Sequence, residues 1–206
     1  MDELTPMVKV KVCGLSRPGD IYAVNEEKPE YVGFVFAESR RNVTPQLAFD
    51  LRKKLAPGII SVGVFVDEDI RNIVSLAWGG VIDVIQLHGS EDEAYIVRLK
   101  TMTNKPIIKA VAVLNEGDVQ KWAETSADFL LLDGKDGGRG QRFDWDLIGK
   151  VDKSFFLAGG LYRENIGKAL AKVKPFAVDV SSGVETDGVK DHAKIREFIR
   201  TVRNGL

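Results

Sequence analysis

The feature that most constrains the fold is a repeat of short apolar, β-branched runs. Eight runs occur, each ending in small or polar residues: VKVKVC, YVGFVF, ISVGVFV, DVIQL, IIKAVAV, DFLLLD, SFFLAG and FAVDVS. Their ends recur about every 24 residues, which is enough for a strand, two short loops and a helix. The spacing therefore predicts repeated βα units.

Helix-like stretches lie between the runs, including PQLAFDLRKKL with Pro45 in a first turn after Thr44, EDEAYIVRLK after Ser90, and RENIGKALAKV. This alternation predicts a parallel sheet. Eight units indicate a closed (β/α)8 TIM barrel, because an open doubly wound sheet usually stops at about five or six strands. The sixth unit is an exception, because the segment after Asp144 has room for only a short or irregular helix. Since no linker-like tract divides the chain, we expect one catalytic domain over residues 1–206.

Charge and composition exclude several classes of function. The chain has 29 basic and 30 acidic residues and a formal net charge of -1, so it carries no general attraction for nucleic acid, and an anionic ligand needs a local site. No apolar run approaches the roughly 20 residues of a membrane span, and the start MDELTPM lacks the features of a secretory signal. We therefore expect a cytoplasmic protein without a membrane partner, and its single cysteine precludes an internal disulfide.

Polar and glycine-bearing segments follow the predicted strands at their C-terminal ends, where barrels of this kind build their active sites. In chain order these are Cys13-Gly14, the loop AESRRNV with Arg41, Asp67, His88-Gly89, Asp133-Gly134, Gly159-Gly160 and Ser181-Ser182-Gly183. Loops are polar and glycine-rich in general, so this set by itself favours an enzyme only modestly.

The glycines after the seventh and eighth strands point to a phosphate site. Barrels often bind phosphate through backbone N–H groups of these two loops, and glycine permits the close approach of the backbone. Gly159, Gly160 and Gly183 are therefore candidates for holding a phosphorylated small molecule. The alternative is that they only make tight turns.

The two-residue period of a strand places Lys11 and Cys13 on the same face of the first strand. If Cys13 faces the barrel mouth, Lys11 lies just beneath it. Asp179 shares a face with Ser181 on the eighth strand, which borders the first in a closed barrel, so Lys11 and Asp179 are expected to pair inside. The pair has a purely structural alternative, because any charge buried in a barrel needs a partner.

The same alternation turns Asp133 inward at the end of the sixth strand. A carboxyl group and the Cys13 thiol would then flank one ligand as two proton-transfer groups. Each has a structural alternative as well. Asp133 also suits a turn cap, and a lone cysteine is more often an inert small apolar residue.

The motifs KVCGL, GFVFAESRRNV, GVFVD, IQLHG, LLLDG with GGRGQRFDW, FLAGGL and DVSSGVE resemble, in that order, those of phosphoribosylanthranilate isomerase. The resemblance covers nearly the whole chain. It implies an enzyme of tryptophan biosynthesis that converts N-(5-phosphoribosyl)anthranilate to 1-(2-carboxyphenylamino)-1-deoxyribulose 5-phosphate. It further implies an Amadori rearrangement that uses neither a metal nor an organic cofactor. The sequence leaves monomer and homodimer open.

The resemblance also implies roles for individual residues. Cys13 matches the family's general base and Asp133 its general acid. The substrate-binding matches are Arg41 at the anthranilate end, His88 in the same pocket, and Asp179 on the eighth strand. The phosphate-binding matches are Gly159 and Gly160 in the phosphate loop, with Ser182 and Gly183 after the eighth strand. We group Lys11 with the substrate-binding residues because of its expected pair with Asp179. His88 has a structural alternative as a turn residue.

Two segments depart from the family pattern. Arg139 and Arg142 stand in GGRGQRFDW where small, polar or lysine residues are expected, and they would either help to hold an anion or be solvated. In SRRNV, Arg40 replaces the more usual proline, which leaves open whether Arg40 or Arg41 faces the substrate. The spacing to Val43 favours Arg41.

The expected chemistry needs one acid and one base. Asp133 would carry a proton when it acts, and Cys13 would act as a thiolate whose pKa nearby Lys11 lowers. One alternative is the related sugar isomerase of the histidine pathway, but that enzyme typically pairs two aspartates and binds a larger bis-phosphate. Another is a phosphosugar-binding barrel without activity, which acts as a sensor or partner subunit. Turnover would separate these alternatives.

Overall fold

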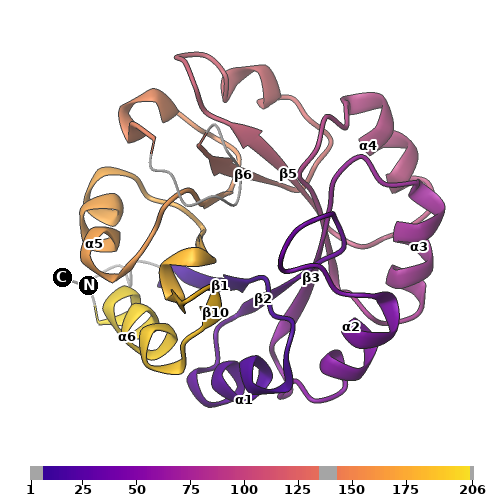
Figure 1. The fold of residues 1–206 in the computed structure, drawn as a ribbon. Coiled ribbons are helices and arrows are strands. Elements are labelled where there is room, and N and C mark those ends of the chain that lie inside the picture. The colour runs from indigo at the N-terminus through magenta and orange to yellow at the C-terminus, as the bar shows by residue number, and fades with distance from the viewer. Residues whose placement is uncertain (1–6, 135–142, 205–206) are drawn as a thin grey trace, which may run out of the picture.

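The computed structural model describes residues 7–134 and 143–204 and shows a closed barrel of parallel strands in sequence order, β1 to β8 (Figure 1). Each strand lies within the apolar run that predicted it. The predicted (β/α)8 barrel is therefore confirmed. The strands are Lys9–Cys13 (β1), Tyr31–Val35 (β2), Ile60–Phe65 (β3), Val84–Leu87 (β4), Ile107–Ala112 (β5), Phe129–Asp133 (β6), Phe155–Leu157 (β7) and Ala177–Val180 (β8).

Helices surround the barrel (Figure 1). They are Pro18–Glu27 (α1), Pro45–Arg52 (α2), Ile70–Trp78 (α3), Glu93–Lys100 (α4), Arg163–Lys172 (α5) and His192–Arg203 (α6). The start of α2 follows the sequence prediction. The Thr44 hydroxyl accepts a hydrogen bond of 3.2 Å from the Leu47 N–H, and Pro45 occupies the first turn, where a missing N–H costs nothing.

The helix predicted directly after Ser90 begins later, at Glu93. Glu91 turns inward instead, where its carboxylate accepts hydrogen bonds of 2.9 Å from the N–H groups of Asp67 and Gly89. Asp92 then caps α4 by accepting from the Tyr95 N–H at 2.8 Å. The loop after β4 is thereby fixed to the loop after β3.

The chain between β5 and β6 forms only the 3-10 turn η1, Gln120–Trp122, where the repeat predicted a helix. The Asp118 carboxylate accepts hydrogen bonds from the N–H groups of Leu114 and Asn115 at 3.0 and 2.8 Å, and Gly117 has a φ of 89°. These local bonds compete with helix formation. The short sixth helix predicted after Asp144 is confirmed as the 3-10 turn η2, Trp145–Ile148.

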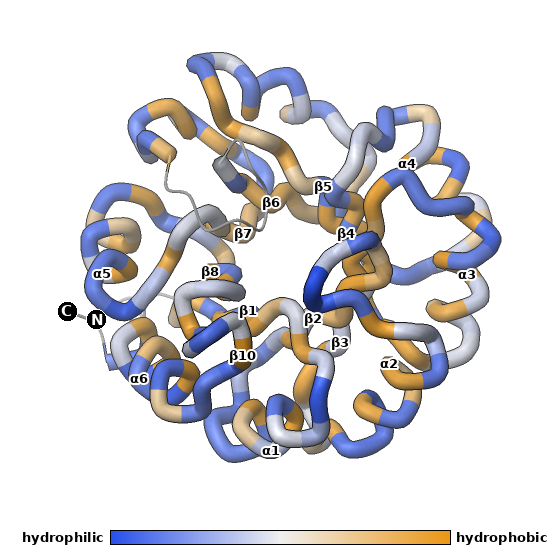
Figure 2. Tube along the Cα trace, in the orientation of Figure 1, coloured by the Kyte–Doolittle hydropathy of each residue, from blue (hydrophilic) through white to orange (hydrophobic). Residues whose placement is uncertain are grey.

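One apolar layer lies between the strands and the helices, and a second fills the inside of the barrel. In Figure 2 apolar residues, coloured orange, recur along the ring of strands. Val10 and Val12 belong to the layer between strands and helices, which contains most of the buried residues. A second cluster fills the inside of the barrel with Tyr31, Val62, Val84, Ile108, Leu131, Phe156, Ala158 and Ala177. Burial of each large apolar side chain contributes about 1.5–3 kcal/mol to folding.

After β8 the chain forms the 3-10 turn η3, Ser182–Val184, and then a two-stranded antiparallel hairpin of β9, Glu185–Thr186, and β10, Val189–Lys190. Figure 1 shows this hairpin beside β1. Within the two described ranges, no helix has the length and apolar character needed to cross a membrane.

Candidate active site

A cavity of about 890 Å³ opens at the C-terminal ends of the strands. This volume suits a small-molecule ligand. Most of the residues selected from the sequence line it: Cys13, Arg41, His88, Asp133, Gly159, Gly160, Asp179 and Ser182. Lys11 and Gly183 are not part of the lining, although both contact residues that are.

Cys13 ends β1 beside Gly33 of β2. A Cβ atom on Gly33 would lie 2.6 Å from the Cys13 Sγ, so glycine provides the space that the thiol occupies. Cys13 is buried yet lines the cavity. Burial raises the pKa of the thiol, and the charge of Lys11 offsets this only in part. The expectation that Lys11 lowers the pKa below its ordinary value is therefore wrong, because the desolvation of a buried thiolate outweighs one cation.

Lys11 and Asp179 are register partners on β1 and β8, as the alternation predicted, and their Nζ and Oδ2 atoms lie 3.0 Å apart. Lys11 is completely buried. Burial opposes its charge, but the Asp179 carboxylate and the Cys13 sulfur together more than compensate and raise the pKa of Lys11. The second carboxylate oxygen, Oδ1, is buried and makes no hydrogen bond within the described residues. Asp179, which lines the cavity, thus has one acceptor without a partner among the described residues.

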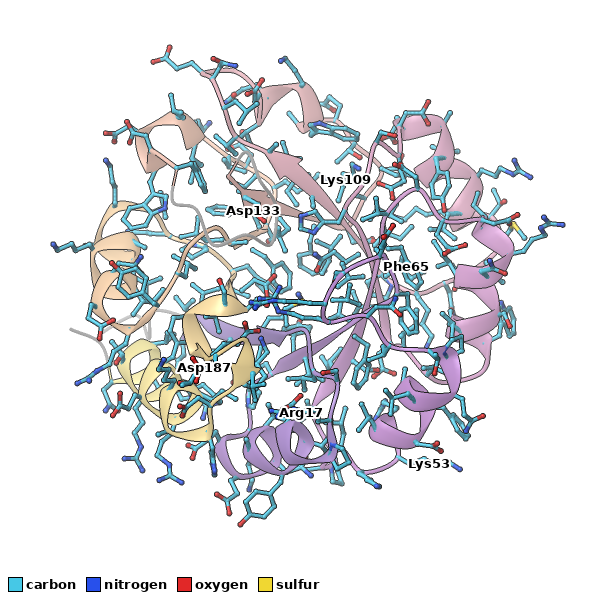
Figure 3. All side chains as sticks on the ribbon, viewed as in Figure 1. Arg17, Lys53, Phe65, Lys109, Asp133 and Asp187 are labelled. Carbon is cyan, nitrogen blue, oxygen red and sulfur yellow. The ribbon has the colours of Figure 1, made fainter. Side chains whose placement is uncertain are left out.

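Asp133 ends β6 and lies on the inner side of the barrel ring (Figure 3). Its Oδ1 accepts a hydrogen bond of 2.7 Å from the Gly134 N–H. Its Oδ2 lies 3.6 Å from the Nε2 of His88. The amide nitrogen of Gln86 donates to His88 Nδ1 at 2.9 Å, so a neutral imidazole carries its proton on Nε2, toward Asp133. The histidine ring is thereby oriented beside the carboxyl group.

The two arginines of SRRNV differ in exposure. The Arg41 side chain is 11% exposed and lies over Gly14, next to Cys13, whereas the Arg40 side chain is 56% exposed and rests against Gly188 of the hairpin. Both line the cavity. Arg41 is thus the more buried of the two arginines and the one that lies beside Cys13.

Two consecutive glycines form the loop after β7. Gly159 and Gly160 have φ values of 83° and 61°, a left-handed conformation that side chains rarely adopt. The buried Asn165 fixes this loop, since its amide donates to the Gly160 carbonyl at 2.7 Å and its oxygen accepts from the Tyr162 N–H at 2.9 Å. Gly159 and Gly160 line the cavity, as does Ser182 of the neighbouring loop.

Gly183 lies where the loops after β7 and β8 touch. A Cβ atom there would collide with the carbonyl oxygen of Leu161. Glycine at this position therefore serves the close packing of the two loops, and the cavity surface is formed by its neighbours Ser181 and Ser182. Arg139 and Arg142 lie outside the described residues.

Sequence reasoning did not single out Glu185, Lys190 or Gln86. Glu185 and Lys190 are buried charges of the hairpin that contacts Arg41. The signal for Glu185 was its place at the end of the quoted motif DVSSGVE, and that for Gln86 was its position two residues before His88 on the same strand face. Lys190 lies beyond the eighth apolar run, so the alternation of side chains along the strands could not predict its position.

Comparisons with known proteins agree with one another. The family model described as N-(5'phosphoribosyl)anthranilate (PRA) isomerase matches residues 10–201. The N-(5'-phosphoribosyl)anthranilate isomerase of Endomicrobium trichonymphae is 49% identical over 202 residues, which cover 96% of this chain and 100% of that protein. The crystal structure of phosphoribosyl anthranilate isomerase from Thermotoga maritima is 37% identical, with a TM-score of 0.86 and coverage of 96% of this chain and 100% of that one.

A further solved structure is that of phosphoribosyl anthranilate isomerase in complex with reduced 1-(o-carboxyphenylamino)-1-deoxyribulose 5-phosphate. It is 36% identical to this chain, with a TM-score of 0.84, and the match covers 96% of this chain and 100% of that one. Sequence, fold and cavity position thus lead to one assignment, and the chain belongs to the N-(5'-phosphoribosyl)anthranilate isomerase family.

Proposed function

We propose that Cys13 and Asp133 are the general base and general acid with which this chain catalyses the isomerase reaction of its family. The reaction is the Amadori rearrangement of N-(5-phosphoribosyl)anthranilate to 1-(2-carboxyphenylamino)-1-deoxyribulose 5-phosphate in tryptophan biosynthesis. The observation that carries the assignment is that a thiol and a carboxyl group, at the ends of β1 and β6, line the same cavity.

The chemistry matches this pair. Opening the aminated furanose needs a proton delivered to the ring oxygen, which Asp133 supplies. The adjacent carbon then loses a proton to the Cys13 thiolate, and the double bond moves to give the enol that becomes the ketose. The anthranilate nitrogen stabilises the cationic intermediate by conjugation, so the protein mainly positions the substrate and transfers protons.

Lys11 and Asp179 support the same site from beneath. Because Lys11 is fully buried, we assign it an indirect role, holding Asp179 and stabilising negative charge on Cys13. Asp179 lines the cavity, and we assign its Oδ1, which has no partner in residues 7–134 and 143–204, to a ribose hydroxyl of the substrate. A buried acceptor without a partner is costly, and a substrate hydroxyl would satisfy it.

Arg41 is assigned to the carboxylate of the anthranilate group, and His88 to the same end of the cavity. A guanidinium group carries five N–H donors, so Arg41 can bind Glu185 and a substrate carboxylate together, whereas lysine offers only a point charge. The low exposure of Arg41 strengthens this interaction, because water competes less in a partly buried site.

Arg41→Lys is expected to raise KM for phosphoribosylanthranilate by about 10-fold or more. Arg40→Lys is the matched control, since the neighbouring arginine is exposed and its charge is retained. Steady-state kinetics of both variants provide the measurement. If Arg40→Lys raises KM and Arg41→Lys does not, the roles of the two arginines are exchanged.

The phosphate group is assigned to the loops after β7 and β8, where Gly159, Gly160 and Ser182 line the cavity. Left-handed glycines expose their backbone N–H groups to a ligand without obstruction by a side chain. Gly183 is assigned to the packing behind this surface, so its substitution would not separate binding from folding.

Ser182→Asp is a cleaner test of the phosphate site, because it adds a negative charge to a half-buried position on the cavity. Repulsion should weaken the binding of inorganic phosphate and product by about 10-fold or more. Ser154→Asp is the control, since it adds the same charge at the exposed N-terminal end of β7. Unchanged phosphate affinity in Ser182→Asp would move the site elsewhere. Isothermal titration calorimetry measures both variants.

The function as a whole is tested by mixing the purified protein with freshly made phosphoribosylanthranilate. Turnover should remove the anthranilate-type fluorescence of the substrate faster than a buffer control. Folded protein that causes no such loss would favour the alternative of a phosphosugar-binding barrel without activity.

Several broader assignments complete the proposal. We assign residues 1–206 to one catalytic domain, which acts as a monomer or homodimer on a small phosphorylated substrate. A solved structure with 36% identity shows mutually generated monomers of the dimeric phosphoribosylanthranilate isomerase from Thermotoga maritima. The cytoplasm is the favoured location, because a thiol base needs a reducing environment.

A further inference from the structure

The hairpin that follows β8 buries two opposite charges. Glu185 of β9 and Lys190 of β10 are register partners, and their side chains are 4% and 2% exposed. Lys190 Nζ lies 2.6 Å from Glu185 Oε1. Charges removed from water to this extent destabilise a fold unless their hydrogen bonds are complete, so the other partners of this pair are informative.

Glu185 binds both arginines of the loop after β2. Its Oε1 accepts from Arg41 Nε at 2.7 Å, and its Oε2 accepts from Arg41 Nη2 at 2.9 Å and from Arg40 Nη2 at 2.6 Å. Burial opposes the charged carboxylate, but the hydrogen bonds from Arg41 and Lys190 prevail and lower the pKa of Glu185. Glu185 therefore remains an anion at neutral pH.

This contact fixes the plane of the Arg41 guanidinium group. Two parallel hydrogen bonds along the Nε and Nη2 edge remove its rotation, and the glycine at position 14 lets the Arg41 side chain lie directly on the backbone beside Cys13. A long side chain otherwise loses rotamer entropy when it becomes ordered, and here the ordering precedes substrate binding.

Lys190 connects the same carboxylate to the catalytic strand. Its ammonium group donates to the Ser181 carbonyl at 3.0 Å, and the Ser181 hydroxyl donates to the Cys13 carbonyl at 3.0 Å. The chain of contacts from Arg41 through Glu185 and Lys190 thus sets the distance between the guanidinium group and Cys13. In Figure 3 the hairpin, marked by Asp187, lies between α6 and the barrel axis.

We propose that Glu185, anchored by Lys190, is the positioning residue that orients Arg41 toward the carboxylate of the substrate and so determines selectivity for the anthranilate end. The inference rests on the proposed role of Arg41. Glu185 does not touch the substrate, because it lies behind Arg41 and is not part of the cavity lining. Its effect should therefore appear only where the substrate offers a carboxylate.

Glu185→Gln keeps the size of the side chain and loses its charge. We expect kcat/KM for phosphoribosylanthranilate to fall by about 10-fold to 100-fold, mainly through KM, since a small misplacement of a binding group has effects of this order. The phosphoribosyl adduct of aniline, which lacks the carboxylate, provides the decisive comparison. Its kcat/KM should change by less than about 2-fold, so the preference for the carboxylated substrate shrinks. Equal losses with both substrates would overturn the proposal.

Two further variants protect the test from a folding defect. Asp83→Asn is the matched control, since Asp83 pairs with Arg52 at 3.0 Å at the opposite end of the barrel, and it should leave both substrates unaffected. Glu185→Gln combined with Lys190→Met removes both members of the buried pair and avoids an unpaired lysine. This double variant should show the same selective loss, and equal kcat/KM losses for both substrates would overturn the proposal.

Arg41→Lys separates this proposal from the one on which it rests. If Arg41→Lys leaves KM unchanged, the role of Arg41 itself is wrong. If Arg41→Lys raises KM and Glu185→Gln does not, only the positioning role fails. When both roles hold, the Arg41→Lys and Glu185→Gln double variant should be little worse than Arg41→Lys alone, because the two residues act as one unit.

Discussion

Cys13→Ser is expected to lower kcat by about 100-fold to 10,000-fold, the range over which a positioned base contributes to a reaction. The substitution keeps the shape of the side chain but replaces the thiol with a hydroxyl that is hard to ionise. Cys13→Ala should be equally impaired. If Cys13 only filled space, both variants would turn over nearly normally and show modest destabilisation instead. Single-turnover kinetics and thermal unfolding separate these outcomes.

The pH dependence of activity in the unmodified enzyme is a second test of Cys13 as the base. Burial raises the pKa of the thiol, so the thiolate is a minor form at neutral pH and its fraction rises about 10-fold for each pH unit below the pKa. The value of kcat/KM, which reports the free enzyme, should therefore climb through pH 8.5, roughly the ordinary pKa of a thiol. Alkylation by iodoacetamide should follow the same curve, since the chain has only 1 cysteine. An alkylation midpoint below pH 8.5 would contradict the raised pKa.

Asp133→Asn is expected to lower kcat by a similar factor of about 100-fold to 10,000-fold, because the amide cannot deliver a proton to the ring oxygen. Its oxygen still accepts the hydrogen bond from the Gly134 N–H, so the turn after β6 should persist. Phosphate affinity and the melting temperature should change little. These measurements distinguish the loss of a general acid from the loss of a residue that caps the turn.

Asp128→Asn is the control for this substitution. Asp128 stands just before the other end of β6 and pairs with Lys100 at 3.0 Å, far from the cavity lining. The same chemical change there should leave kcat close to that of the unmodified enzyme. Near-normal turnover in Asp133→Asn would remove Asp133 from the mechanism.

The barrel and much of the site could be predicted because strands impose strict local rules. The repeat of apolar runs located the strands, and the alternation of side chains brought Lys11 to Asp179. The same rules gave the wrong direction for the pKa of Cys13, since a period reports which groups are neighbours but not how completely they are buried.

The remaining differences arise where the chain leaves the strands. Glu91 interrupts the start of α4 because of hydrogen bonds to loop backbone that are distant in sequence. The pairing of Glu185 with Lys190 depends on a hairpin too short to leave a pattern. The close contact of Gly183 with Leu161 was likewise not predictable, because it joins two loops that the motifs describe separately.

The pair of Lys11 and Asp179 also has a consequence for how the barrel closes. β1 and β8 lie near opposite ends of the chain, and their pairing joins the two edges of the sheet. A slip of one residue would place Val178 or Val180 opposite Lys11 and leave a buried ammonium group without its carboxylate, at a cost of about 3–5 kcal/mol. The ion pair thus selects one alignment of the seam, and it does so only once the eighth strand has been synthesised.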